Sequence, residues 1–95
     1  MGGASPELPR TVMVEVVNQN FYDLNVLAAY QGDVQRRLGF VAGFQTDTFT
    51  LPWRSQQLVM ISEFVGGGGT VSNVLDVDRG DFLQLIILPD AHRRR

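Results

Sequence analysis

Cysteine is absent from this 95-residue chain, and so is lysine, because all eight basic residues are arginines. Without cysteine there is no disulfide, no thiolate-bound metal and no cysteine nucleophile. The single histidine, His92, lies three residues from the end of the sequence, where no fixed partner would orient it as a general base. We therefore expect no catalytic residue, no enzymatic activity and no cofactor.

Excess charge is also scarce, with a formal net charge of −2. Residues 11–88 carry four arginines against eight acidic residues, whereas residues 89–95 carry Asp90 against Arg93, Arg94 and Arg95. An acidic body argues against a nucleic-acid partner, which would favour a basic face. The basic tip predicts at most a weak contact with an anionic membrane surface or an acidic protein, since each charge contributes about 1 kcal/mol there.

Long hydrophobic runs are missing too. No apolar stretch approaches the roughly 20 residues that a membrane-spanning helix needs, and no charged-then-apolar leader opens the chain. We therefore expect a soluble or membrane-peripheral protein, and the cytoplasm is the favoured compartment.

What the sequence does contain is a period-2 alternation of apolar and polar residues, which is typical of half-buried strands. Val12, Val14 and Val16 alternate with more polar neighbours, and no window shows the 3.6-residue spacing of an amphipathic helix. The first expected strand begins at Thr11 and ends at the turn 18–20. The other six cover 23–31, 34–42, 45–51, 57–64, 70–77 and 82–88. This spacing predicts a single all-β domain, a seven-stranded antiparallel β-sandwich over 11–88. The prolines before residue 11 predict an extended N-terminal arm (1–10), and residues 89–95 form a basic C-terminal tail.

Local signals refine this pattern. Gln31-Gly32-Asp33 predicts a tight hairpin turn, and Gly39 is a reasonable position for a β-bulge.

The last expected strand, 82–88, is apolar on both faces. It is either a central strand covered on both sides or a strand whose outer face is an interface, since exposed apolar strand surface is otherwise a liability.

Three segments look familiar: residues 16–26, residues 37–43 and residues 48–52, which read VVNQNFYDLNV, RLGFVAG and TFTLP. With them, most of residues 11–88 resembles a group of small bacterial proteins of unassigned function. The resemblance implies an immunoglobulin-like or transthyretin-like sandwich. It departs at Arg79-Gly80-Asp81, where the group has Pro-Gly-Asp, and in the absence of the lipoprotein-type leader that relatives often carry.

Aromatic and arginine residues in the expected turns are the most informative candidates for a binding site, because these types anchor protein interfaces. We predict partner contacts by Tyr22 in the first turn, by Trp53 and Arg54 in the fourth, and by Arg93, Arg94 and Arg95 in the tail. Phe21 is expected to fold back and plug the end of the sandwich.

Three further motifs have simpler interpretations. Asp76, Asp78 and Asp81 surround one turn as calcium prefers, but turn chemistry and the positive Arg79 favour a plain hairpin, so we predict no metal. Arg79-Gly80-Asp81 matches the tripeptide of cell-adhesion ligands and is explained by the same turn. The glycines of 66–69 do not lead into a helix, which argues against a phosphate-binding loop.

These observations favour an interaction module, a small accessory or stabilising subunit that docks on protein partners in a larger complex. The resemblance adds one host, a photosynthetic reaction-centre and light-harvesting complex. The alternative is a ligand-binding sandwich, for carbohydrate or adhesion, in which Trp53 and Tyr22 provide stacking surfaces. A third possibility is self-assembly by strand addition.

Overall fold

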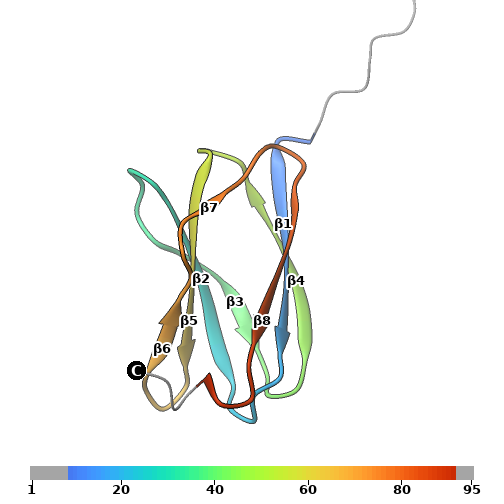
Figure 1. Ribbon diagram of the computed structural model, residues 1–95, viewed down its shortest axis with the longest axis vertical. Helices are drawn as coiled ribbons and strands as arrows, with labels where there is room; N and C mark the ends of the chain where they lie inside the picture. The colour runs from blue at the N-terminus through green and yellow to red at the C-terminus, as the bar shows by residue number, and fades with distance from the viewer. Residues whose placement is uncertain (1–8, 92–95) are drawn as a thin grey trace, which may run out of the picture.

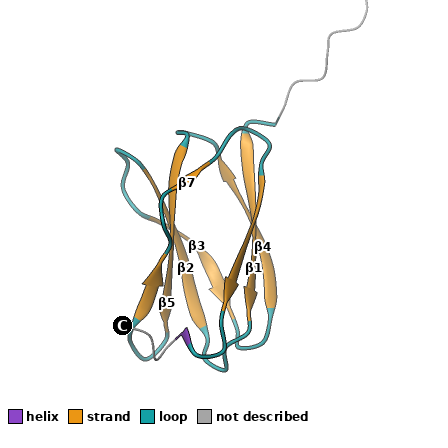
Figure 2. Ribbon diagram, in the orientation of Figure 1, coloured by secondary structure: helices purple, strands orange, loops and turns teal. Residues whose placement is uncertain are grey.

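The computed structural model describes residues 9–91, which form two β-sheets around one core (Figure 1). The strands are β1 (Thr11–Asn18), β2 (Leu24–Tyr30), β3 (Arg36–Val41), β4 (Thr46–Pro52), β5 (Gln57–Phe64), β6 (Gly69–Val71), β7 (Leu75–Asp76) and β8 (Phe82–Ile87). One sheet has the order β4-β1-β8 and the other β3-β2-β5-β6, with β7 also paired to β5. Strands and the loops between them make up nearly all of the described chain (Figure 2). The prediction of an all-β fold is confirmed.

The core lies between the two sheets and is built by alternation along the strands. β1 and β2 bury every second residue, as the sequence pattern predicts, and β5 does the same from the second sheet. The fully buried apolar side chains that meet between the sheets include Val12, Val14, Val16, Leu24, Val26, Val41, Leu51, Leu58 and Met60. Burying each such side chain contributes roughly 1.5–3 kcal/mol, so this face-to-face packing provides most of the driving force for folding.

Strand number is the first correction, since the described chain has eight strands rather than seven. The expected strand over 70–77 is divided into β6 and β7. The cause is Ser72, whose hydroxyl accepts a hydrogen bond from the Met60 N–H (2.9 Å) and donates one to the Asn73 carbonyl (2.7 Å). A side chain thus takes the place of a backbone acceptor, and the ladder on β5 is interrupted.

Strand direction is the second correction, because the sheets are not entirely antiparallel. β8 pairs with β1 in parallel, with Met13 opposite Phe82 and Asn18 opposite Ile87. After β5 the chain forms β6 and β7, crosses to the other sheet, and enters β8 at the end of the molecule where β1 also begins. At that end the Gly80 N–H donates to the Thr11 carbonyl (2.7 Å). Parallel pairing follows because both strands then run away from that end.

β8 lies at the edge of its sheet, so the interpretation of 82–88 as a central strand is wrong. Its buried and partly buried residues alternate with exposed ones, and Phe82 and Ile86 are 58 % and 45 % exposed. The interface interpretation stays a prediction.

The predicted hairpin between β2 and β3 is confirmed, and Gly32 adopts φ 79° in its turn. The register of this pair shifts beside Gly39, which confirms an irregularity there. Gly39 also lacks room for a side chain, because a Cβ atom would lie 2.5 Å from Cε1 of Phe49 on β4.

The segments beyond the strands are described only in part. Residues 9 and 10 belong to the predicted N-terminal arm, and the Arg10 carbonyl accepts a hydrogen bond from the Trp53 N–H (2.9 Å). At the other end, Ala91 is 6 % exposed and belongs to the core, so the first residues after β8 pack against the body. Between residues 9 and 91 no helix is long and apolar enough to cross a membrane.

Candidate functional site

The best candidate for a binding site is a group of aromatic side chains at one end of the molecule. Phe21 and Tyr22 come from the β1–β2 turn, Phe44 from the β3–β4 turn, and Phe64 from the end of β5; we call this group the aromatic end. Edge-to-face contacts join the rings, with centroid distances of 5.7 Å for Phe21–Tyr22, 6.2 Å for Phe21–Phe44 and 6.5 Å for Tyr22–Phe64. Phe21, Phe44 and Tyr22 are 73 %, 66 % and 45 % exposed, so the group is held together yet open to solvent.

Two buried asparagines hold the β1–β2 turn. The Asn18 amide donates to the carbonyls of Tyr22 (2.9 Å) and Ala42 (3.1 Å), and its oxygen accepts the Asn20 N–H (2.9 Å). The Asn20 oxygen in turn accepts the Tyr22 N–H (2.9 Å). Asx turns of this kind fix backbone conformation, and here both side chains are almost fully buried. The two aromatic residues are therefore presented on a rigid turn.

The β3–β4 turn is built to approach this first turn closely. A Cβ atom on Gly43 would collide with the Phe21 carbonyl, so only glycine fits there. The Gly43 N–H donates to the Asp23 carboxylate (2.8 Å), and the Phe44 N–H donates to the Asn20 carbonyl (3.1 Å). Phe44 has φ 62°, a left-handed conformation that costs a phenylalanine about 1–2 kcal/mol. The turn thus accepts backbone strain while it exposes an aromatic ring, a combination that points to a function.

The Asn18 and Asn20 amides also connect this end to the rest of the fold. The Asn20 amide donates to the carbonyls of Leu88 (3.2 Å) and Pro89 (3.0 Å), directly after β8.

A depression of about 240 Å³ lies beside Tyr22, lined by Phe64, Val65, Gly66 and Gly67. Its volume is below that of typical small-molecule sites, roughly 300–1,000 Å³, and is suited to a side chain of a partner.

The predicted contact residues divide between the two ends of the molecule. Tyr22 belongs to the aromatic end, whereas Phe21 is exposed there, so the prediction that Phe21 plugs the sandwich is wrong. Trp53 and Arg54 follow β4 at the opposite end, because Pro52 pairs with Thr11 at the start of β1. The length of β1 places them about 25 Å from Tyr22.

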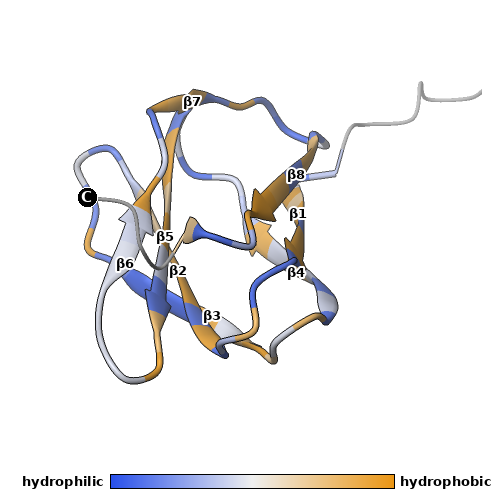
Figure 3. Cartoon of the chain, turned by 60° about the horizontal axis from the view of Figure 1, so that its bottom comes forward, coloured by the Kyte–Doolittle hydropathy of each residue, from blue (hydrophilic) through white to orange (hydrophobic). Residues whose placement is uncertain are grey.

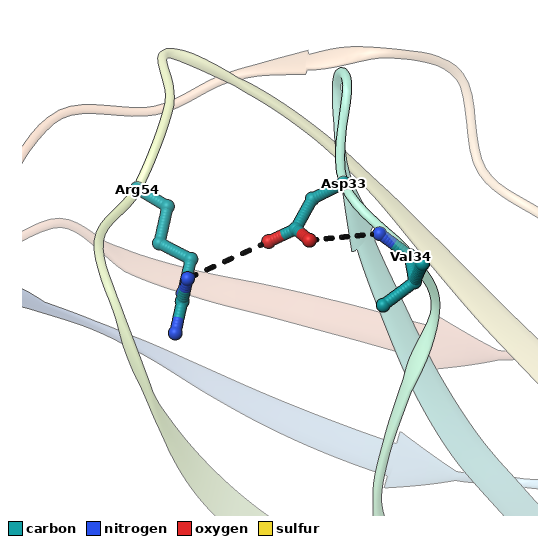
Figure 4. A network of polar contacts seen from close by, with 3 residues as sticks. All are labelled: Asp33, Val34 and Arg54. Atoms are coloured by element: carbon teal, nitrogen blue, oxygen red, sulfur yellow. Dashed lines mark hydrogen bonds and ion pairs between the residues drawn. The ribbon is translucent and has the colours of Figure 1, made fainter.

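Trp53 is partly buried and packs against the core, and its indole N–H donates to the Val77 carbonyl (3.1 Å). This gives the side chain a structural role that closes the far end of the sheets. Arg54 lies 3.7 Å from the Asp33 carboxylate, which also accepts the Val34 N–H (2.8 Å; Figure 4). The Arg54 and Asp33 side chains are 50 % and 36 % exposed, so solvent screens this ion pair and it adds little stability. Arg93, Arg94 and Arg95 lie outside the described residues.

Phe64 and Phe44 are the members of the aromatic end that the sequence interpretation missed, and of the two only Phe44 is exposed. The available signal for Phe44 was an aromatic residue directly after a turn glycine, in a hairpin that ends beside the first turn. Asn18 and Asn20 were interpreted only as turn formers, although their burial makes them the supports of the site.

The motifs set aside above show turn geometry. The Asp81 carboxylate accepts the Asp78 N–H (2.8 Å), and within residues 9–91 no group of three metal-binding side chains gathers. Gly66, Gly67 and Gly68 all have positive φ, which explains a glycine-rich β5–β6 connection.

Tyr30 is a core residue whose pKa lies above its ordinary value. Burial raises the pKa, and the Arg54 backbone and the charges of Arg36 and Arg54 oppose this shift. The hydroxyl is buried and makes no well-formed hydrogen bond among residues 9–91, although the Arg54 backbone lies close enough to oppose the pKa shift. Tyr30 points into the core rather than toward a site.

No family model matches this chain, and no curated protein matches it. Among solved structures it is similar to an NMR structure of a protein from Eubacterium rectale. The two share 11 % identity over 79 % of this chain and 78 % of that chain, with a TM-score of 0.55. At this identity the likeness shows the fold alone and carries no function.

Proposed function

We propose that this chain is a non-enzymatic interaction module, a small accessory subunit that docks on a protein of a larger assembly through its aromatic end. The observation that carries the proposal is the rigid exposure of Phe21, Tyr22 and Phe44 on two interlocked turns. Exposed aromatic rings on a soluble domain are costly to leave in water, and aromatic residues dominate the binding energy of protein interfaces.

Rigidity supports docking for an energetic reason. Ordering an interface loop on binding costs roughly 0.5–1.5 kcal/mol per immobilised side chain. The asparagine-held β1–β2 turn and the close contact at Gly43 meet this cost during folding. Replacing one ring at the centre of such a patch typically weakens binding by about 2 kcal/mol or more.

We also propose the finer fold assignment, an immunoglobulin-like or transthyretin-like sandwich. Two sheets that share one core support it, as do the edge positions of β4, β8 and β3. An experimental structure with its strand connectivity is the test, and a closed barrel would contradict the assignment.

The docking proposal is tested by photo-crosslinking in extracts of the source cells. A benzoylphenylalanine placed at Phe21 should capture one defined partner, whereas the same group at Val34 should not. Val34 is a suitable control because it is 77 % exposed and lies in the β2–β3 hairpin at the opposite end. Equal capture from both positions, or none from Phe21, would contradict docking through the aromatic end.

The captured partner then allows a binding measurement. Phe44→Asn removes a ring while suiting the left-handed backbone, and it should weaken partner binding about tenfold or more. Val34→Ser should leave the affinity unchanged. The resemblance suggests a photosynthetic reaction-centre and light-harvesting complex as the host. In that complex Arg93–Arg95 would face anionic lipid. Capture of an unrelated soluble protein would reject this host.

A ligand-binding sandwich is the second candidate, favoured by Tyr22 beside the 240 Å³ depression and by an open depression of about 570 Å³ that shares its Phe64 and Val65 lining. Trp53 is poorly suited to stack on a sugar, because it packs on the core and its indole N–H is already bonded. Binding on a glycan array that disappears in Tyr22→Ala would support this candidate, and an array without binding would remove it.

A further inference from the structure

β8 differs from the other sheet edges in having no feature that prevents pairing with another strand. Native edges are protected by charge, proline, bulges or shortness. β3 carries exposed Arg36 and Arg37 and a register shift, β4 carries Asp47 and ends at Pro52, and β6 has only three residues. β8 has six residues, FLQLII, without charge, proline or register shift.

The backbone groups of β8 divide into two sets. The carbonyls of Asp81 and Ile87 accept hydrogen bonds from Met13 and Gln19 on the β1 side, so odd-numbered residues face β1. The N–H and C=O groups of Phe82, Gln84 and Ile86 therefore point away from the sheet, where no strand among residues 9–91 pairs with them. The Leu88 carbonyl is already bonded to the Asn20 amide, which ends the free edge.

The side chains of these same three residues lie on the outer face. They stand in register with Met13, Glu15 and Val17 of β1, and the Gln84 amide donates to the Glu15 carboxylate (2.8 Å). Phe82, Ile86 and Met13 are 58 %, 45 % and 41 % exposed. The free edge thus adjoins a face on which exposed apolar residues flank the Gln84–Glu15 pair, and Figure 3 shows β8 as a mainly hydrophobic strand.

We infer that β8 pairs antiparallel with β8 of a second copy of this chain, about a two-fold axis through Gln84. In this register Phe82 faces Ile86 of the second copy, and Gln84 faces Gln84. All three residues have outward backbone groups, so each facing pair exchanges two N–H···O bonds. The Phe82–Ile86 contacts are cross-strand aromatic–aliphatic pairs, which stabilise sheets.

Charge favours a second copy as the occupant of this edge. The body of the chain is acidic, so two copies repel wherever their carboxylates meet. β8 itself carries no charged residue, the Asp81 carboxylate directly before it accepts the Asp78 N–H, and the Glu15 carboxylate beside it is bonded to Gln84. The pairing uses no residue of the aromatic end, so it is independent of the proposed docking role.

Sedimentation over a concentration series tests the inference. Strand-edge interfaces are small, in the transient class below about 1,200 Å², so the full chain should change from monomer to dimer between about 1 µM and about 1 mM. Gln84→Pro removes an outward N–H that the monomer does not use, and it should raise the dimer dissociation constant at least about tenfold. A monomer at every concentration would overturn the inference.

The control is Thr48→Pro on β4, whose N–H also points outward because Gln45 faces β1. It should dimerise like the unmodified chain, and equal loss in both variants would overturn the role of β8. If Gln84→Pro does not fold by circular dichroism, Ile86→Lys replaces it, because a lysine on an edge strand opposes pairing and its ammonium would have to be desolvated in the dimer. Dimerisation unchanged in Ile86→Lys would overturn the inference as well.

A disulfide reports the register directly, because the natural chain has no cysteine. Facing residues of a hydrogen-bonded pair have Cα atoms about 5.5 Å apart, within disulfide reach. Gln84→Cys should therefore form a covalent dimer on mild oxidation. Ile86→Cys should not, since its symmetry mate is about 13 Å away. Preferential cross-linking of Ile86→Cys would overturn the proposed register.

Discussion

Replacing Asn18 by alanine should destabilise the whole domain, although the side chain belongs to a turn. Asn18 is 2 % exposed, and its amide donates to the carbonyls of Tyr22 and Ala42 while its oxygen accepts the Asn20 N–H. Each such hydrogen bond contributes about 1 kcal/mol net, and a buried group left without its partner costs about 1–3 kcal/mol. We therefore expect Asn18→Ala to lower the free energy of unfolding by about 3–4 kcal/mol.

Chemical denaturation at neutral pH measures this change, and thermal unfolding should show a decrease in Tm of about 15 °C or more for a domain of this size. A second measurement is amide hydrogen exchange, which should lose protection at Asn20, the residue whose N–H is bonded to the removed oxygen.

Asn25→Ala is the matched control. Its side-chain oxygen accepts a hydrogen bond from Arg37 (2.8 Å) on the exposed face of β2, so its loss should cost less than about 0.5 kcal/mol. Equal destabilisation by the two substitutions would refute the reasoning, because it would show that burial of the Asn18 bonds does not determine their contribution.

Three further predictions concern stability. At pH 7 the free energy of unfolding of Tyr30→Phe should equal that of the natural chain or exceed it by up to about 1 kcal/mol, because the buried hydroxyl makes no well-formed hydrogen bond. The folded-state pKa of Tyr30 lies above 10.0, so the natural chain should lose stability as pH rises from 10.0 toward that pKa. Urea titrations of Tyr30→Phe over the same pH range should not show this loss. Phe44→Asn should change stability by less than about 1 kcal/mol in calorimetry, since relief of the left-handed backbone offsets the lost ring contact, and a loss above about 2 kcal/mol would contradict this. Gly39→Ala should destabilise by about 1–3 kcal/mol through the Phe49 ring, and Phe49→Leu should restore part of this in a double-mutant cycle.

The parts of the fold that the sequence predicts are those governed by local alternation and turn chemistry. Val12, Val14 and Val16 can be buried together only on one face of a strand, and Gly32 marks a hairpin between neighbouring segments. Such signals depend on residues close in sequence, which is why strand β5 has the predicted bounds of 57–64.

The errors share one physical cause, contacts between distant segments. The parallel pairing of β8 with β1 depends on a crossover between sheets, and the division of 70–77 depends on Ser72 bonding to Met60. The same holds for the site, because Phe44 joins Phe21 only after two hairpins bring their turns together. Trp53 as a partner contact stays a prediction: its residue type favours interfaces, while its packing against the core depends on segments distant in sequence.

The two proposed surfaces are related through the direction of β8. The Ile87 end of β8 lies beside Asn18 at the aromatic end, and the Phe82 end lies beside Met13 at the opposite end. Antiparallel pairing about Gln84 places each Ile87 end next to the Phe82 end of the second copy, so the two aromatic ends of a dimer point in opposite directions. A dimer of this form cannot bind one flat host surface twice and gains no avidity there. It would instead bridge two host copies, which gives a two-to-two complex in which the β8 edge sets the spacing and the aromatic ends provide the contacts.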